Sequence, residues 1–365
     1  MSDLQFEQVA NIKVFGIGGG GCNAVNRMVS EGVKGVEFYV ANTDLQALNI
    51  SPVENKIVLG REVTKGLGAG ANPEMGRRAA QENENEIREA IKGSDMVFIT
   101  TGLGGGTGTG AAPMFAKIAK EEGALTVGIV TKPFTFEGKK RMNSAEDGLA
   151  ELKQYVDSLI IVSNNNLIEV IGRRPLTEAF QAADNVVRQG VQTITDLIAV
   201  PALINLDFAD VRTIMENQGS ALIGIGMAEG EDKARAAAEK AIQSPLLEAQ
   251  ITGASNAIVN ITGGESITLF DAEDAMALVR EAAGNDIDAI FGVAINEKLG
   301  DSIIVTVIAT GFDKEEEEEE EIPAASAFTQ PVSRPSARVQ TEEKPRYQEL
   351  EEDDREGIPS FFSRR

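Results

Sequence analysis

Short apolar runs alternate with helical patterns through the first half of the chain. Apolar runs bounded by glycine and polar residues are typical of buried strands, and apolar positions that recur every three or four residues are typical of helices. The predicted strands cover residues 12–18, 37–41, 96–100, 124–131 and 159–163. The predicted helices cover residues 22–29, 72–93, 112–122 and 144–155. This alternation predicts a parallel, doubly wound α/β sheet, and ligands of such sheets bind at the carboxyl ends of the strands.

The pattern changes after residue 175. Apolar residues then recur every three or four positions from Leu176 to Ile198, which predicts one long helix over residues 176–200 that is buried along one side. Further on, strands at 221–225, 257–261 and 303–309 and a helix at 231–243 predict a second, smaller α/β domain.

The composition changes again at Asp313, where polar and charged residues replace the apolar pattern. Residues 315–321 are all Glu, and Pro, Ser and charged residues follow, so we expect a disordered acidic linker. The last eight residues, Ile358–Arg365, are apolar and aromatic with a basic end, which is typical of a docking peptide, although a frayed terminus is the simpler alternative. The predicted divisions are a flexible N-terminus at 1–10, a nucleotide-binding domain at 11–175, a central helix at 176–200, an α/β domain at 201–312, a linker at 313–357 and a terminal peptide at 358–365.

Charge and rare residues narrow the function classes. The formal net charge of −23 argues against binding to nucleic acid or directly to an anionic membrane. No signal peptide or membrane span is evident, so we expect a cytoplasmic protein without direct membrane insertion. The single Cys22 excludes an internal disulfide, and the absence of His excludes the catalytic sites that depend on imidazole.

Two glycine clusters are the strongest chemical signal. Residues 104–110, Gly-Gly-Gly-Thr-Gly-Thr-Gly, follow a predicted strand and precede a helical pattern that begins near Ala111. Such a loop turns several backbone N–H groups inward, its two threonines add hydroxyls, and it is typical of a phosphate site. Gly18–Gly21 form a similar cluster after the first strand. Two such sites at neighbouring strand ends favour a mononucleotide with a triphosphate chain.

The first cluster also permits another interpretation. Gly16, Gly18 and Gly21 have the GxGxxG spacing of dinucleotide enzymes, and Asp44 stands about 20 residues further on, so an NAD-dependent oxidoreductase is an alternative. The second glycine cluster has no role in that alternative. The chain contains neither GxxxxGK[ST] nor NKxD, which excludes the P-loop nucleotide hydrolases and base recognition of the small G-protein kind.

Six motifs together resemble the FtsZ group of the tubulin/FtsZ family, the GTPases of bacterial cell division. The resemblance covers about residues 10–312 and the terminal peptide, and Cys22 departs from it because the family usually has Gly or Asn there. The matching segments are Gly18–Gly21 with Asn23, Ala41–Asp44, Gly68–Asn72, Gly104–Gly110, Pro133–Gly138 with Arg141, and Asn205–Asp210. The resemblance implies a tubulin-like fold with GTP or GDP and Mg²⁺ as ligands, and it assigns no protein ligands to the metal.

The resemblance also implies roles for individual residues. Glu137 would bind the ribose hydroxyls, and Arg141 would lie beside the sugar and phosphates. The full set of expected GTP-binding residues is Gly18, Gly19, Gly20, Gly21, Cys22, Asn23, Asn26, Asn42, Asp44, Ala69, Gly70, Ala71, Asn72, Gly104, Gly105, Gly106, Thr107, Gly108, Thr109, Gly110, Pro133, Glu137, Arg141, Asn164, Phe180 and Asp184.

Two residues of the long helix fit recognition of a guanine base. Phe180 and Asp184 are four positions apart and share a helix face. Phe180 can cover the base, or it can simply pack in the core. Asp184 can accept from the two N–H donors that guanine presents and adenine lacks, and a carboxylate within an apolar stripe is otherwise hard to explain.

Asn205, Asp207 and Asp210 leave two interpretations open. Two carboxylates three positions apart are what ordinary helix capping requires. The resemblance instead implies that these residues project from the opposite end of the subunit into the GTP site of the next copy, where Asp207 and Asp210 polarise the attacking water and Asn205 helps to place it.

We therefore expect a GTPase that polymerises head to tail and forms a division ring at the cell midpoint, beneath the membrane. Its terminal peptide, Ile358–Arg365, would bind membrane-anchored division adaptors. A related tubulin-like filament protein of plasmid segregation is the nearest alternative.

Overall fold

The computed structural model describes residues 10–172, 175–199, 207–244, 250–284 and 287–312. The expectations for the N-terminus, for Asn205, for the linker and for the terminal peptide lie outside these ranges. The strands are β1 (Ile12–Ile17), β2 (Glu37–Asn42), β3 (Asn55–Val58), β4 (Met96–Gly102), β5 (Leu125–Lys132), β6 (Ser158–Ser163), β7 (Gly219–Ala228), β8 (Asn256–Gly263), β9 (Asp288–Ile295) and β10 (Ile303–Thr310). The helices are α1 (Gly18–Ser30), α2 (Leu45–Ile50), α3 (Arg61–Thr64), α4 (Pro73–Glu82), α5 (Glu84–Ile91), α6 (Thr107–Glu121), α7 (Lys139–Lys153), α8 (Asn164–Ile171), α9 (Leu176–Ala199), α10 (Phe208–Met215), α11 (Lys233–Ile242) and α12 (Leu269–Ala283), with short 3₁₀ turns at Thr135–Glu137 and Glu297–Leu299.

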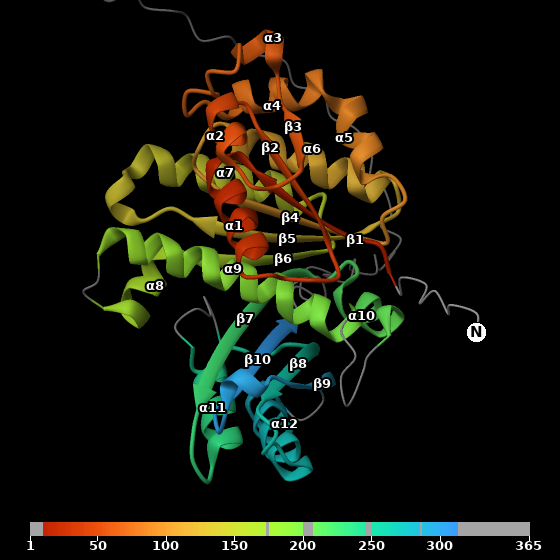
Figure 1. The fold of residues 1–365 in the computed structure, drawn as a ribbon, viewed down its shortest axis with the longest axis vertical. Coiled ribbons are helices and arrows are strands. Elements are labelled where there is room, and N and C mark those ends of the chain that lie inside the picture. The colour runs from red at the N-terminus through yellow and green to blue at the C-terminus, as the bar shows by residue number, and fades with distance from the viewer. Residues whose placement is uncertain (1–9, 173–174, 200–206, 245–249, 285–286, 313–365) are drawn as a thin grey trace, which may run out of the picture. The chain divides into compact units, whose positions relative to one another are not determined.

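The described strands form one sheet in the order β3-β2-β1-β4-β5-β6-β7-β10-β8-β9 (Figure 1). From β3 to β7 every neighbouring pair is parallel, whereas β10 runs antiparallel to both β7 and β8. The sequence predicted this parallel arrangement for β1, β2, β4, β5 and β6, but not the strand β3 or the pairing of β7 with β6. Ile17 pairs with Thr101, so β1 and β4 end at the same level. This register brings the two glycine clusters, at the starts of α1 and α6, together at the end of the sheet where the parallel strands finish.

The second α/β region continues the same sheet. Strand β7 joins β6 through the pairs from Ser158↔Gly219 to Ile160↔Ala221. Strand β9 and helix α12, which the sequence analysis did not predict, complete this region beside β8. The boundaries proposed between the two domains stay a prediction.

Apolar side chains fill both faces of the parallel sheet. On one face α9 contributes Ala183, Val187, Val191 and Ile194, all buried against strand residues such as Ile129. This confirms the buried side predicted for the long helix. On the other face, α6 contributes Phe115 and its neighbours to a second cluster. The sheet is therefore held between two helical layers, which fixes the level of its strand ends.

One predicted helix is broken in the structure. Residues 72–93 form α4 and α5, which are separated at Asn83. The side-chain Oδ1 of Asn83 accepts from the backbone amide of Gly60 at 2.8 Å, and the backbone of Asn83 leaves helical geometry. A contact distant in sequence thus overrides a continuous helical pattern.

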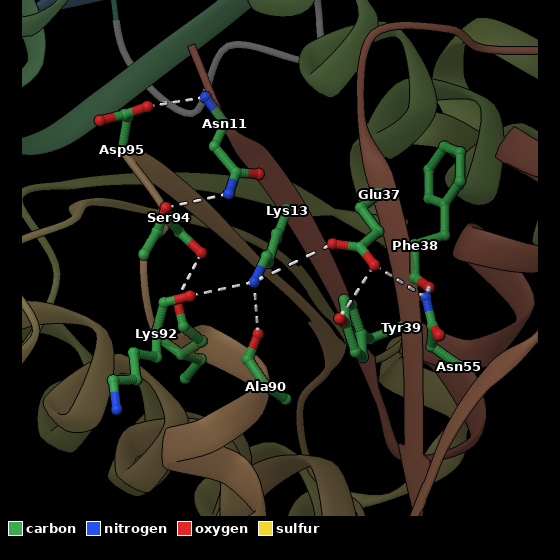
Figure 2. A network of polar contacts seen from close by, with 12 residues as sticks. Asn11, Lys13, Glu37, Phe38, Tyr39, Asn55, Ala90, Lys92, Ser94 and Asp95 are labelled. Atoms are coloured by element: carbon green, nitrogen blue, oxygen red, sulfur yellow. Dashed lines mark hydrogen bonds and ion pairs between the residues drawn. The ribbon is translucent and has the colours of Figure 1, made fainter. Parts of the chain in front are cut away.

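Polar contacts link the amino ends of β1 and β4 to neighbouring segments (Figure 2). The buried Lys13 donates from Nζ to the carbonyl oxygens of Ala90 at 2.8 Å and Lys92 at 3.3 Å, at the carboxyl end of α5. The amide of Asn11 donates to Oδ2 of Asp95 at 2.7 Å (Figure 2). These contacts tie β1 and β4 to α5 at the edge opposite the glycine clusters. Within the described ranges, no helix has the length and apolar character needed to cross a bilayer.

Candidate functional site

A cavity of about 230 Å³ opens at the carboxyl ends of β1, β4 and β5. Its walls come from α1, the ends of β4 and β5, the 3₁₀ turn at Thr135–Glu137, α7, α8 and α9. Of the residues predicted from the sequence, it brings together Gly20, Asn23, Pro133, Glu137, Arg141, Asn164, Phe180 and Asp184.

The first glycine cluster forms the turn from β1 into α1. Gly18 has a left-handed φ of +69°, and a Cβ there would approach the amide of Gly108 to 2.7 Å. A Cβ on Gly21 would collide with the carbonyl oxygen of Thr100. In contrast, a Cβ on Gly19 would meet no atom within 4 Å. The helix starts at Gly18 instead of residue 22, and the amides of its first turn have no partners within their own helix.

The second glycine cluster is half loop and half helix. Helix α6 begins at Thr107, earlier than predicted, so the amides of its first turn lack partners in their own helix. Gly108 sits where a Cβ would collide with the Thr101 hydroxyl, whereas Gly105 has nothing within 4 Å. Free amides together with the positive end of the helix dipole favour an anion here.

The two threonines of this cluster bond within the protein. Thr109 Oγ1 accepts from the amide of Gly104 at 2.8 Å, and Thr107 Oγ1 lies 2.6 Å from Thr43 Oγ1. Both side chains are buried. Their hydroxyls therefore shape the loop, and the backbone amides are left as its donors toward a ligand.

The loop at residues 68–72 packs beside this helix start. Gly70 and Ala71 have left-handed φ values of +60° and +56°, the latter uncommon for a residue with a side chain. A Cβ on Gly106 would come within 2.8 Å of Ala69 and of the Asn72 amide. Asn72 caps α4 by accepting from Glu74 N at 3.1 Å. This predicted segment thus forms part of the wall around the second glycine cluster.

Glu137 and Arg141 form an ion pair at the cavity. Glu137 Oε2 lies 3.0 Å from Arg141 Nε, while its other oxygen accepts from the amide of Phe134 at 2.9 Å. Phe134 in turn meets the ring of Phe180 edge-on at 5.3 Å between centroids. Phe180 lines the cavity and is 42% exposed, so part of its ring is available to a ligand.

Two acceptors in this cavity are shielded from water, and one of them has no donor. Burial raises the pKa of Asp184 to about 6, and Arg27 acts in the opposite direction without cancelling the effect. Oδ1 of Asn164 is buried and has no hydrogen-bond partner. Unpaired buried acceptors are costly, so a ligand that supplies N–H or O–H donors is favoured at this end. The residues present therefore fit a nucleotide, with phosphates at the amides and a donor-bearing base at Asp184.

Four predicted residues support the site without lining the cavity. Asn26 accepts from Ser51 Oγ at 2.5 Å, and Asp44 caps α2 by accepting from Gln46 N at 2.8 Å. Asn42 is buried and accepts from the amide of Asp44 at 3.3 Å. Cys22 is buried too, and that burial raises the pKa of its thiol to about 12, which excludes a reactive thiolate.

The sequence analysis missed several lining residues. Thr100, Thr101, Gly102 and Thr131 line the cavity from the ends of β4 and β5, and Ala183 and Val187 line it from α9. The expectation that ligands bind at strand ends could have found the first four. The spacing of three and four residues around Phe180 and Asp184 could have found the last two.

Asp207 and Asp210 lie at the opposite end of the sheet, where the parallel strands begin. They cap α10, as the helix-capping interpretation of the sequence predicted, and both are exposed. From the same helix, Arg212 Nη2 donates to the carbonyl oxygen of Asp95 at 3.3 Å. Asp95 immediately precedes β4, so α10 lies where the parallel strands begin (Figure 1). The two acids and the cavity therefore do not meet within one copy of the chain.

Comparisons with known proteins agree with this geometry. Residues 11–172 match the GTPase domain of the tubulin/FtsZ family, and residues 219–313 match the C-terminal domain of the FtsZ family. A structure of an FtsZ dimer from M. jannaschii is similar, with 44% identity, a TM-score of 0.81, and coverage of 85% of this chain and 90% of that one. CetZ2 from Haloferax volcanii, solved as a GTPγS-bound protofilament, has the same fold at 21% identity, with a TM-score of 0.72 and coverage of 82% and 92%.

The fold and the cavity thus define a nucleotide-binding protein of tubulin-like architecture. The chain belongs to the tubulin/FtsZ family of GTPases, and its C-terminal domain places it with FtsZ. Its enzymatic activity is the hydrolysis of GTP, which sets aside the NAD-dependent oxidoreductase that the first glycine cluster had left open.

Proposed function

We propose that this GTPase polymerises head to tail, and that each catalytic site is completed by the next copy. The observation that carries the proposal is the separation of the two halves of the site. The glycine clusters lie at the carboxyl ends of the parallel strands, and Asp207 and Asp210 lie at the amino ends of these strands. When copies stack in the same direction, the end of one copy that carries the glycine clusters meets the end of the next copy that carries the two acids. Such a contact is heterologous and does not close, so a linear filament results.

The chemistry assigned to each half follows from its residues. The amides of Gly19–Asn23 and Gly105–Gly108 bind the phosphates, Phe180 covers the base, and Asp184 accepts from the two guanine N–H groups. Asp207 and Asp210 accept hydrogen bonds from the attacking water and orient it toward the terminal phosphorus, with Asn205 helping to place it. Water adds at that phosphorus as the bond to the bridging oxygen breaks, which gives GDP and phosphate.

Mg²⁺ fits this site as a companion of the phosphates. The described residues contain no cluster of three or more acidic or thiol side chains that would cage a metal. Mg²⁺ keeps several waters and binds phosphate oxygens in such sites, where it neutralises charge. The protein would contribute backbone amides that hold the triphosphate in position for the ion.

Two structurally similar proteins support self-association. The M. jannaschii FtsZ was solved as a dimer and CetZ2 as a protofilament. We propose the division ring as the cellular assembly, with Ile358–Arg365 binding membrane-anchored adaptors. Deleting that peptide should leave polymerisation intact and abolish recruitment to the division site. A filament of plasmid segregation predicts no such loss, because it needs no division adaptor.

Complementation between two inactive variants tests the shared site. Asp210→Ala keeps the GTP cavity and removes an acid, whereas Asp184→Ala keeps the acids and impairs guanine binding. We expect each variant alone to hydrolyse GTP slowly and their mixture to recover activity, because Asp210→Ala cavities meet intact acids from Asp184→Ala copies. A mixture no more active than the sum of its parts would contradict the proposal.

A further inference from the structure

A lysine at the far end of the phosphate-binding helix is bonded to the turn that follows the acid-bearing helix. Lys120 lies in the last turn of α6, whose first turn belongs to the second glycine cluster. Its Nζ donates to Oδ1 of Asn217 at 3.1 Å and lies 3.3 Å from Oδ1 of Asp157. Asn217 comes two residues after the end of α10. Through this one side chain, a helix that starts at the phosphates contacts the segment that carries Asp207 and Asp210.

The Lys120 side chain is 43% exposed, and the buried carboxylate of Asp157 anchors its contact. The side chain of Asp157 is 6% exposed, and its Oδ2 accepts from the amide of Thr126 at 2.8 Å. Its carbonyl oxygen accepts from the amides of Gln218 at 2.8 Å and Gly219 at 2.9 Å. Asp157 thereby fixes the turn after α10 to the start of β5, and Lys120 is an ion-pair partner of this buried carboxylate.

The backbone of this turn is unusual. Asn217 has a left-handed φ of +53°, a conformation that asparagine tolerates better than most residues. The end of α10 is held as well, since Ser158 Oγ donates to the carbonyl oxygen of Met215 at 2.6 Å and Thr310 Oγ1 to that of Ile214 at 2.9 Å. Side chains of β6 and β10 therefore hold the end of the acid-bearing helix, and Lys120 of α6 holds the turn that follows it.

We propose that Lys120 is a positioning residue for GTP hydrolysis: by bonding Asn217 it sets where α10 presents Asp207 and Asp210 to the neighbouring copy. The inference rests on the shared site proposed above. A misplacement of about 1 Å in a catalytic group lowers a rate by roughly a hundredfold. A modest loosening of this turn should thus reduce turnover, while GTP binding in the same copy stays unchanged because the cavity lies at the other edge of the sheet.

Substitutions at Asn217 isolate the bond. Asn217→Gly keeps the left-handed backbone and removes the acceptor, and we expect kcat to fall about 5- to 20-fold with KM for GTP unchanged. Asn217→Asp keeps an oxygen for Lys120 and should retain most of the activity. Lys120→Met removes the donor of the same bond and should lower kcat in the same way. Lys117→Met is its matched control, because Lys117 is also on α6 and pairs with Glu121 of the same helix at 3.9 Å. It should behave like the unaltered protein, and thermal unfolding of all variants checks their folding.

Mixing experiments locate the defect of Asn217→Gly. If its acids are misplaced, mixing it with Asp184→Ala restores hydrolysis, because Asn217→Gly cavities then meet well-placed acids. Mixing it with Asp210→Ala gives no gain. The reverse pattern, or an Asn217→Gly variant with unchanged kcat, overturns the proposal.

The reference mixture separates this inference from the function on which it rests. If Asp210→Ala and Asp184→Ala restore each other's activity while Asn217→Gly and Asp184→Ala do not, the shared site stands and the role of Lys120 falls. If the reference mixture shows no recovery, the shared site fails and the role of Lys120 falls with it.

Discussion

Asp207 and Asp210 form a reciprocal capping box at the start of α10. Asp207 Oδ1 accepts from the amide of Asp210 at 2.8 Å, and Asp210 Oδ2 accepts from the amide of Asp207 at 3.4 Å. Each of these caps uses one carboxylate oxygen. Capping and water orientation, which the sequence presented as alternatives, are therefore compatible in one structure. Capping is confirmed, and the catalytic role stays a prediction.

Asp210→Asn should separate these two roles. Asparagine keeps an acceptor for the cap and loses the charge that polarises water, so we expect the thermal midpoint to change little and GTP turnover to fall by about a hundredfold or more. Filaments formed by this variant should persist, because GTP in them is not consumed. Light scattering and phosphate release measure both effects, and loss of GTP binding would show that Asp210 is misplaced in this account.

The affinity for guanine nucleotide should depend on pH through Asp184. Burial raises its pKa to about 6, and only the ionised carboxylate accepts from both N–H groups of guanine. Binding of GDP, measured on dilute protein, should therefore weaken as the pH falls from 7.5 toward 5, by up to about tenfold per pH unit below the pKa. A constant affinity over this range would remove Asp184 from the base site.

Asp184→Asn should change the preferred base. An asparagine amide offers one donor and one acceptor, which is complementary to xanthine, with its carbonyl in place of the guanine amino group. We expect weaker binding of GDP, improved binding of xanthosine diphosphate, and no pH dependence from this position. Equal losses for both nucleotides would indicate that the substitution only damages the cavity.

Alanine at two neighbouring glycines should have opposite consequences for folding. A Cβ at Gly108 collides with Thr101, whereas at Gly105 it meets nothing within 4 Å. Gly108→Ala should lower the free energy of unfolding by about 1–3 kcal/mol through overpacking, and Gly105→Ala should unfold like the unaltered protein. Urea denaturation of both variants without nucleotide makes the comparison, and equal stabilities would contradict the packing described for the second glycine cluster.

Asp196→Asn should stabilise the protein in a pH-dependent way. Burial raises the pKa of Asp196 to about 6, against the opposing effects of Gln192 and Arg188, so the folded state holds this proton more tightly than the unfolded state. The stability given by the neutral form is lost as the pH rises from about 4 through 6. At pH 7.5 the variant should melt about 2 °C or more above the unaltered protein. At pH 4.5 the difference should shrink, and a lower melting temperature at pH 7.5 would refute the burial argument.

The sequence predicted those parts of the fold that have strong local periodicity. The parallel arrangement of β1, β2, β4, β5 and β6 and the buried face of α9 followed from apolar spacing, but the order of the strands in the sheet did not. The helix starts at Gly18 and Thr107 did not, because glycine disfavours helices locally. Gly108 is accommodated in α6 by its close approach to Thr101, and the helix break at Asn83 is set by its bond to Gly60. Neither contact is visible in the local pattern.

The candidate site was predictable to a similar degree. Glycine spacing and family resemblance pointed to the two glycine loops that lie at the cavity end of the sheet, and the carboxylate of Asp184 within an apolar stripe pointed to a residue that lines the cavity. Their roles in binding phosphates and base stay predictions. Spacing and resemblance could not show that Thr107 and Thr109 bond within the protein, or that Asn26 accepts from Ser51 outside the cavity. Such details depend on which elements pack together, and that is known only from the structure.

The most direct test of the shared site is the GTPase rate per molecule as a function of protein concentration. Because the cavity and the acids lie at opposite ends of the parallel strands, the protein at high dilution, where single copies predominate, should turn over almost no GTP. The rate per molecule should rise steeply above a threshold concentration, the same one at which filaments appear by sedimentation. A rate per molecule that is constant from high dilution to the polymerised state would contradict this account.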